Sequence, residues 1–282
     1  SAFGYFNTAG GLASSAFGWS NTASAENASA FGYVNEASGL ASSALGFRNK
    51  AANENASAVG YGNNAGGVAS SAFGFSNVAK VDYASAFGYS NEASGLASSA
   101  VGFRNKAASE NASAVGYGNN ANALAASAVG YNNTAGGVGS STIGYNNTAT
   151  NENASAFGYG NTAGGLASSA FGFSNTASGD NANAFGYNNI ASGSKSNVFG
   201  TGNTVSGSSS TAVGTANEVA AENSTAIGNN NTISAGAENS AALGNNISIS
   251  LKDSVALGNN STATAINSVT GNSSYTKWAG VS

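Results

Sequence analysis

The stretch SSAFGFSN spans residues 70–77 and recurs unchanged at residues 168–175. The two copies start 98 residues apart, which is seven times fourteen. Glycines mark the same fourteen-residue interval along the chain, at 4, 18, 32, 46 and onward to 228, and after one sixteen-residue step at 244 and 258. A fixed internal period is typical of repeat architectures, so this period decides the fold.

The residues around each of these glycines form a constant frame. The residue before the glycine is large and apolar, and the residue two before it is Ala except at Thr142 and Val198. An aromatic residue follows the glycine in the first fourteen repeats, Asn lies three residues after it in the seventeen regular repeats, and Ala, later Val or Ile, lies five after it. The frame S-A-(F/V/I/L)-G-(Y/F/W)-x-N-x-A alternates large and small residues, which is typical of a β-strand.

Fourteen residues are too few for a helical-hairpin repeat, so each repeat is expected to form one coil of a solenoid. The first strand of a coil should cover S-A-F-G-Y, and a second short strand should cover either N-x-A or the A-S before the next core. Stacked coils align identical residues. Successive coils should lie about 4.8 Å apart and be joined by backbone hydrogen bonds. The sequence therefore predicts an all-β parallel β-roll in which the recurring asparagines form a ladder at a turn. The ladder begins with Asn7, Asn21, Asn35, Asn49, Asn63 and Asn77.

The large residue before each glycine is expected to fill the inside of the coil, while Ala and Gly permit close approach elsewhere. A coil of this size holds only one thin layer of side chains, so an apolar stripe must remain outside, and self-association would bury it. We expect the aromatic residues after the glycines to pack in the core or between subunits, with an exposed adhesive face as the alternative. The candidate core or trimer-packing residues are Phe3, Phe17, Phe31, Leu45, Val59, Phe73, Phe87, Val101, Val115 and Val129.

Charge is scarce and avoids the frame. The chain has 12 acidic and 8 basic residues, a net charge of −4, and neither His nor Cys. This composition lacks the basic surface that nucleic acid requires, and it removes the commonest catalytic bases, nucleophiles and metal ligands. We therefore expect a non-enzymatic protein without a metal or cofactor, whose uncharged frame positions are buried.

Two identical basic spots are separated by four coils, or about 19 Å. They are candidate contacts for an acidic or collagen-like ligand, although pairing with Glu54 and Glu110 on the same edge is the favoured alternative. The four residues are Arg48, Lys50, Arg104 and Lys106.

The frame resembles the N-S-V-A-I-G-x-x-S repeats in the YadA-like heads of trimeric autotransporter adhesins. The resemblance runs from residue 1 to about residue 263 and is plain in D-S-V-A-L-G-N-N-S-T-A at residues 253–263. It implies a left-handed parallel β-roll that assembles as a homotrimer at the fibre tip, on the outer membrane of a Gram-negative bacterium. The head would attach to matrix proteins such as collagen or fibronectin, to host cells or to abiotic surfaces. Contact with the membrane would come only through a C-terminal anchor outside this chain.

The same resemblance divides the chain into a head, residues 1–252, a neck, residues 253–267, and the start of a connector, residues 268–282. In the neck, chains of this family cross to a neighbour. Because the chain starts in mid-pattern, we interpret it as part of a longer protein. An ice-binding solenoid or a structural surface-fibre subunit is the alternative function, but the threonines are too irregularly spaced to favour ice binding.

Overall fold

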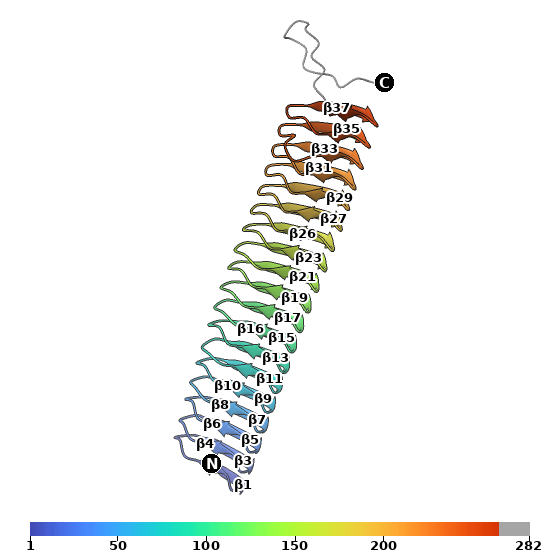
Figure 1. Ribbon diagram of the computed structural model, residues 1–282. Helices are drawn as coiled ribbons and strands as arrows, with labels where there is room; N and C mark the ends of the chain where they lie inside the picture. Colours follow the sequence, from blue (N-terminus) through green and yellow to red (C-terminus); the bar gives the residue numbers. More distant parts are fainter. Residues whose placement is uncertain (265–282) are drawn as a thin grey trace, which may run out of the picture. The chain divides into compact units, whose positions relative to one another are not determined.

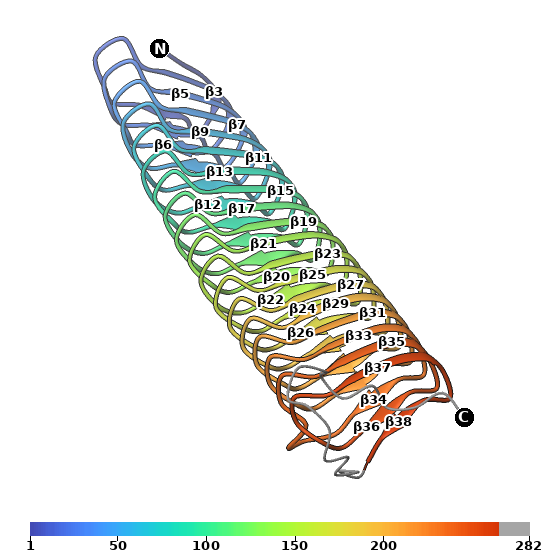
Figure 2. The same cartoon turned by 90° about the horizontal axis from the view of Figure 1, so that it is seen from above.

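The computed structural model describes residues 1–264, and all of their regular secondary structure is β. The chain divides into two compact units, Ser1–Tyr145 (unit 1) and a second that starts at Asn146 (unit 2). Within each unit the coils stack in sequence order, as Figures 1 and 2 show. Neighbouring coils pair through parallel strands in both units, which confirms the prediction of an all-β parallel solenoid.

Each coil contains a long strand and a two-residue short strand. The long strands of unit 1 are β1 (Ala2–Tyr5), β3 (Ser15–Trp19), β5 (Ser29–Tyr33), β7 (Ser43–Phe47), β9 (Ser57–Tyr61), β11 (Ser71–Phe75), β13 (Ser85–Tyr89), β15 (Ser99–Phe103), β17 (Ser113–Tyr117), β19 (Ser127–Tyr131) and β21 (Ser141–Tyr145). Its short strands are β2 (Thr8–Ala9), β4 (Thr22–Ala23), β6 (Glu36–Ala37), β8 (Lys50–Ala51), β10 (Asn64–Ala65), β12 (Val78–Ala79), β14 (Glu92–Ala93), β16 (Lys106–Ala107), β18 (Asn120–Ala121) and β20 (Thr134–Ala135).

Unit 2 follows the same plan. Its long strands are β23 (Ser155–Tyr159), β25 (Ser169–Phe173), β27 (Asn183–Tyr187), β29 (Asn197–Thr201), β31 (Thr211–Thr215), β33 (Thr225–Asn229), β35 (Ala241–Asn245) and β37 (Val255–Asn259). Its short strands are β22 (Thr148–Ala149), β24 (Thr162–Ala163), β26 (Thr176–Ala177), β28 (Ile190–Ala191), β30 (Thr204–Val205), β32 (Glu218–Val219), β34 (Thr232–Ile233), β36 (Ser248–Ile249) and β38 (Thr262–Ala263).

Identical residues lie side by side in neighbouring coils. Between β11 and β13, for example, Ala72 pairs with Ala86 and Phe73 with Phe87. The short strand falls in the N-x-A part of the repeat, one of the two places predicted for it. A first turn, two and three residues after each glycine, leads from the long strand to the short strand. A second turn, six to ten residues after the glycine, leads to the next long strand.

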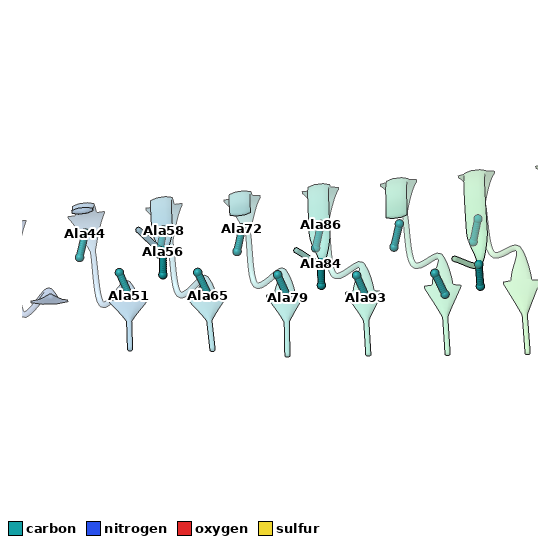
Figure 3. Close-up of a cluster of buried hydrophobic side chains, with 14 of the residues drawn as sticks. Ala44, Ala51, Ala56, Ala58, Ala65, Ala72, Ala79, Ala84, Ala86 and Ala93 are labelled. Atoms are coloured by element: carbon teal, nitrogen blue, oxygen red, sulfur yellow. The ribbon is translucent and has the colours of Figure 1, made fainter. Parts of the chain in front are cut away.

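Alanine, not phenylalanine, fills the inside of nearly every coil in unit 1. Ala44 and Ala58 point from the long strands toward Ala51 and Ala65 on the short strands, and all four are fully or almost fully buried (Figure 3). The expectation that the Phe/Val position points inward is therefore wrong. The two strands of a coil face each other closely, so small side chains fill the space between them in unit 1, where Thr142 is the one buried exception to alanine at these strand positions. Because side chains alternate along a strand, Ser, Phe and Tyr of the frame then face outward.

The recurring glycine is required by both conformation and space. Gly88 has φ +116°, and a Cβ at this position would overlap the carbonyl oxygen of Gly102 in the next coil. The same overlap is found at nearly every frame glycine of both units. The glycine thus lets successive coils approach to hydrogen-bonding distance where the long strand bends.

The frame asparagines form a buried ladder at the first turn. The side-chain amide of Asn91 donates to Asn77 Oδ1 at 3.0 Å, to Phe87 O at 2.9 Å and to Gly102 O at 2.7 Å. Its Oδ1 accepts from the backbone N–H of Asn105 at 2.9 Å and from the Asn105 amide at 3.0 Å. Each amide therefore satisfies backbone groups of its own coil and the next coil, in a place that water does not reach.

The later coils of unit 2 have a larger interior. Val198, Val205, Val219, Ile233 and Ile249 are fully buried at positions that alanine occupies in earlier coils. The sixteen-residue repeat leaves the strand register intact, because Ala226 on β33 pairs with Ala242 on β35. Residues 253–264, where the neck is expected, contain one further coil with β37 and β38. The rest of the expected neck and the whole connector, residues 268–282, lie outside the described residues.

Candidate adhesive surface

The outer face of the long strands is uncharged along both units. It carries the residues three before, one before and one after each glycine, and none of these is Asp, Glu, Lys or Arg. In unit 1 the three positions form a serine column, a Phe/Val column (Phe3 to Ile143) and an aromatic column (Tyr5 to Tyr145). The prediction that all uncharged frame positions are buried thus holds for the Asn and Ala positions after the first coil, whereas the large apolar residues are exposed or half-buried in the single chain.

The Phe/Val column contains all ten candidate core or trimer-packing residues. Leu45, Phe87, Val101 and Val115 are exposed, and Phe3, in the first coil, is 73% exposed. The others are half-buried. Side chains of the column pack on their equivalents in the next coil, as Phe17 does on Phe31 with ring centroids 5.1 Å apart. This half-buried group comprises Phe17, Phe31, Val59, Phe73 and Val129.

The aromatic column is a continuous stack of rings. Tyr89 lies 4.9 Å from Phe75 and 4.8 Å from Phe103 between ring centroids, with interplanar angles of 3° and 8°. Its side chain is nevertheless 39% exposed. Because the ring faces are occupied by neighbours, the column presents ring edges and tyrosine hydroxyl groups to a partner. It does not offer free faces on which sugars or bases could stack.

The basic spots lie at the first turn and on the short strand. The Arg48 guanidinium carbon lies 5.2 Å from the centre of the Phe47 ring, and Arg104 lies 5.1 Å from Phe103. These two phenylalanines are half-buried, whereas the other rings of the column are exposed. Lys50 Nζ forms an ion pair with Glu36 Oε1 at 3.3 Å.

The expected pairing of the basic residues with Glu54 and Glu110 on one edge is wrong. Both acidic residues lie in the second turn, at the other end of the strands from Arg48 and Arg104. The acidic partner of Lys50 is instead its neighbour Glu36, because the residue four after each glycine pairs with its equivalent on the adjacent short strand. The sequence already indicated this ion pair, because Glu36 and Lys50 occupy the same position of the repeat, four residues after the glycine.

A family model for the YadA head domain repeat matches residues 9–34, 37–63, 65–91, 93–119, 108–133, 135–161, 163–189, 206–231 and 252–269. The chain belongs to the YadA head family. This family provides surface-exposed, adhesin-type heads of autotransporter proteins. A search of curated proteins found no match.

The second-turn edge of this YadA-type head alternates between apolar and acidic residues. In successive coils of unit 1 the residue eight after the glycine is Leu12, Glu26, Leu40, Glu54, Val68, Asp82, Leu96, Glu110, Leu124 and Val138. Asp82 also accepts a hydrogen bond from the backbone N–H of Val68 at 2.8 Å. All four acidic residues of this row are exposed, so from Leu12 to Leu124 the edge offers a carboxylate at every second coil.

Two further features of the described part of the head concern metal ions and the membrane. Residues 1–264 contain no group of three or more His, Cys, Asp or Glu side chains that could hold a metal ion. The same residues include no helix long and apolar enough to cross a membrane. The features that recur along the head are its surface columns.

Proposed function

We propose that this chain is the head of a homotrimeric adhesin that attaches a bacterium to other surfaces through many repeated weak contacts. The observation that carries the proposal is the uncharged, apolar outer face of the long strands in a chain of the YadA head family. A column of exposed Phe, Leu and Val next to a column of rings is unusual for a surface that stays in water. Burial of this face against two further copies explains why it carries no charge.

In such a trimer the short strands and parts of both turns remain outside and are available to ligands. The second-turn carboxylates recur at every second coil and the short-strand lysines after four coils, so a fibrous or flat partner would meet the same group more than once. Many weak contacts then give strong attachment through avidity. Collagen or fibronectin, host cells and abiotic surfaces are partners of this extended kind, and a fibre tip on a Gram-negative outer membrane would present the head to them.

Lys50 and Lys106 lie on this outer surface, on the short strands, and are the contacts that we propose for acidic ligands. Both side chains are exposed. Lys50 is partly neutralised by Glu36, whereas Lys106 has no ion pair among residues 1–264. Arg48 and Arg104 lie instead at the border of the uncharged face, each against a ring of the aromatic column.

The trimer is tested by the mass of the purified chain in solution, measured by light scattering. We expect the mass of three chains, and a stable single chain would contradict the proposal. Attachment is tested with cells that display the protein with or without residues 1–252, on collagen, fibronectin and plastic. Unchanged attachment of cells lacking the head to all three would exclude the adhesive role.

The proposed lysine contacts have a matched control. The double variant Lys50→Glu/Lys106→Glu should attach less well to a sulfated polysaccharide surface. Lys80→Glu changes the charge in the second turn of the same unit and should attach like the unchanged protein. An equal loss in both variants would show an effect of net charge rather than a contact.

A further inference from the structure

The two edges of unit 1 carry opposite charges. The first turn and the short strand, which together form the first-turn edge, hold four basic and two acidic residues: Arg48, Lys50, Arg104, Lys106, Glu36 and Glu92. The second-turn edge holds four acidic residues and one basic residue: Glu26, Glu54, Asp82, Glu110 and Lys80. The turns join opposite ends of the strands, so this charge difference runs across the width of the roll.

The two edges also match coil by coil. The coil that places Phe6 on the first-turn edge places Leu12 on the second-turn edge, and the coil with Val34 has Leu40. Arg48 shares its coil with Glu54, and Arg104 shares its coil with Glu110. In unit 1, wherever the residue two after the glycine is apolar and larger than alanine, the residue six positions later is apolar as well. Wherever the residue two after the glycine is basic, the residue six positions later is acidic.

Contacts within one chain do not explain this match. Arg48 is exposed and rests on Phe47, and within residues 1–264 neither Arg48 nor Arg104 has a carboxylate partner. Glu54 is exposed as well, and Asn55 donates to it at 3.5 Å. The matched residues lie at opposite ends of the strands, so a contact between them requires two copies of the chain.

We infer that the first-turn edge of one copy packs against the second-turn edge of the next copy, with each coil facing the same coil of its neighbour. The inference rests on the proposed trimer and states how its subunits meet. The outer face of the long strands runs from the second turn to the first turn. When three copies turn this face to a common axis, the first-turn end of each copy meets the second-turn end of the next.

The closed ring fixes the register of this contact. Two different edges in contact form a head-to-tail interface, which closes into a ring only if successive copies are not displaced along the axis. Each coil therefore faces the same coil of the neighbouring copy. Arg48 then faces Glu54 of the partner subunit, and Arg104 faces Glu110 of the partner subunit. In the first coil of the chain, the Phe6 side chain would have the partner subunit's Leu12 as its apolar contact.

The contact can be tested by cross-linking, because the natural chain contains no cysteine. In the variant Arg48→Cys/Glu54→Cys, a short bifunctional maleimide should link each copy to the next and yield covalent dimers and trimers on a denaturing gel. Arg48→Cys/Glu110→Cys places the second cysteine four coils away and should give none. Glu36→Cys/Lys50→Cys joins neighbouring coils of one chain and should yield only internally linked monomers.

Light scattering on each uncross-linked variant separates this inference from the proposed function. A mass of three chains together with covalent trimers from Arg48→Cys/Glu54→Cys supports both. A mass of three chains without intermolecular cross-links overturns the edge contact but leaves the trimeric head intact. A mass of one chain overturns both, and equal cross-linking of the Arg48→Cys/Glu110→Cys variant overturns the register.

Charge reversal provides a second measurement. Arg48→Glu/Arg104→Glu should lower the urea concentration at which the trimer dissociates, and the additional changes Glu54→Arg/Glu110→Arg should restore it. Restoration would not occur if the arginines bound a polyanionic ligand instead of the neighbouring copy. In that case the two-residue variant would keep its trimer stability and lose only the binding of a sulfated polysaccharide.

Discussion

Unit 1 and the later coils of unit 2 stabilise the same backbone in different places. In unit 1 the interior is alanine and each coil adds one ring to the aromatic column outside. From β29 onward, Val198, Val205, Val219 and Ile233 enlarge the interior, and the ring is replaced by Thr201, Thr215 or asparagine. The coils with a larger buried interior therefore lack an aromatic residue after the glycine on the outer face.

The magnitudes of the two contributions are similar. Replacing a buried alanine with valine adds two methyl-sized groups, or about 1.6 kcal/mol at about 0.8 kcal/mol each. A stacked aromatic pair contributes about 0.5–1.5 kcal/mol beyond the area that it buries. One interior valine can therefore substitute for one ring per coil, so the aromatic column of unit 1 is at least in part a stabilising element of the single chain.

The largest expected loss of stability comes from changing the frame glycines, which both regions share. Gly88→Ala in unit 1 and Gly214→Ala in unit 2 should each cost roughly 4 kcal/mol or more, because the added Cβ overlaps backbone and the φ angles are +116° and +123°. Gly62→Ala is the control, since its nearest neighbour would be Ser76 Oγ at 3.6 Å and other coils carry Ser or Asn there. Urea denaturation would measure the losses. Tolerance of Gly214→Ala alone would show that the larger interior also loosens the backbone.

The asparagine ladder should matter next. Asn91→Ile removes an amide that serves Phe87 O, Gly102 O and Asn105, so buried groups are left unpaired at roughly 1–3 kcal/mol each. We expect a loss of about 3 kcal/mol or more in unit 1. Unit 2 contains the natural counterpart Ile247, whose backbone N–H still donates to Asn231 Oδ1 at 3.0 Å.

Hydrogen exchange would show whether the loss from Asn91→Ile is confined to the coils around β13 and β15. Ile247→Asn is the reverse change, and we expect it to gain little, because the next residue of the column is Ser261, which has no amide to extend the ladder. A large gain would mean that the end of the ladder at Asn231 is a weakness of unit 2 rather than an adaptation to its interior.

The period made the solenoid, the long strands and the asparagine ladder predictable from the sequence, and it left two possible places for the short strand. Fourteen-residue spacing fixes which residues become neighbours, so Asn77 and Asn91 had to meet once the coils stacked. The inward face was not predictable, because Ala72 and Phe73 alternate and either could point inside. The structure makes this choice through packing between the two strands of a coil, where Ala72 is fully buried and Phe73 faces outward. The partner of Lys50 was missed because pairing follows the position within the repeat, not nearness in sequence.

Exchanging the two interiors should have an intermediate effect. Val198→Ala should destabilise unit 2 by about 1–2 kcal/mol, because it removes buried groups in a coil without a ring in the aromatic column. Ala86→Val should destabilise unit 1 by about 1–3 kcal/mol, because Ala79 and Ala93 leave no space for two more methyl groups. Chemical denaturation of the two variants would test this. A stabilising Ala86→Val would show that the interior of unit 1 has unused space. Its small size would then not explain why the phenylalanines face outward.

The smallest effect should come from the aromatic column itself. Tyr89→Thr, which copies the residue of later coils, breaks two stacks and should cost about 1 kcal/mol, because the rings are partly exposed and keep only part of their contact. Thr201→Tyr extends the column beyond Tyr187 and should gain less than Tyr89→Thr loses, because the new ring has only one aromatic neighbour among the described strands. Both changes should be measured in the single chain and in the assembled protein. A loss that appears only in the assembly would assign the rings to the contact between subunits, whereas a loss already present in the single chain would show that they compensate for an interior built from alanine.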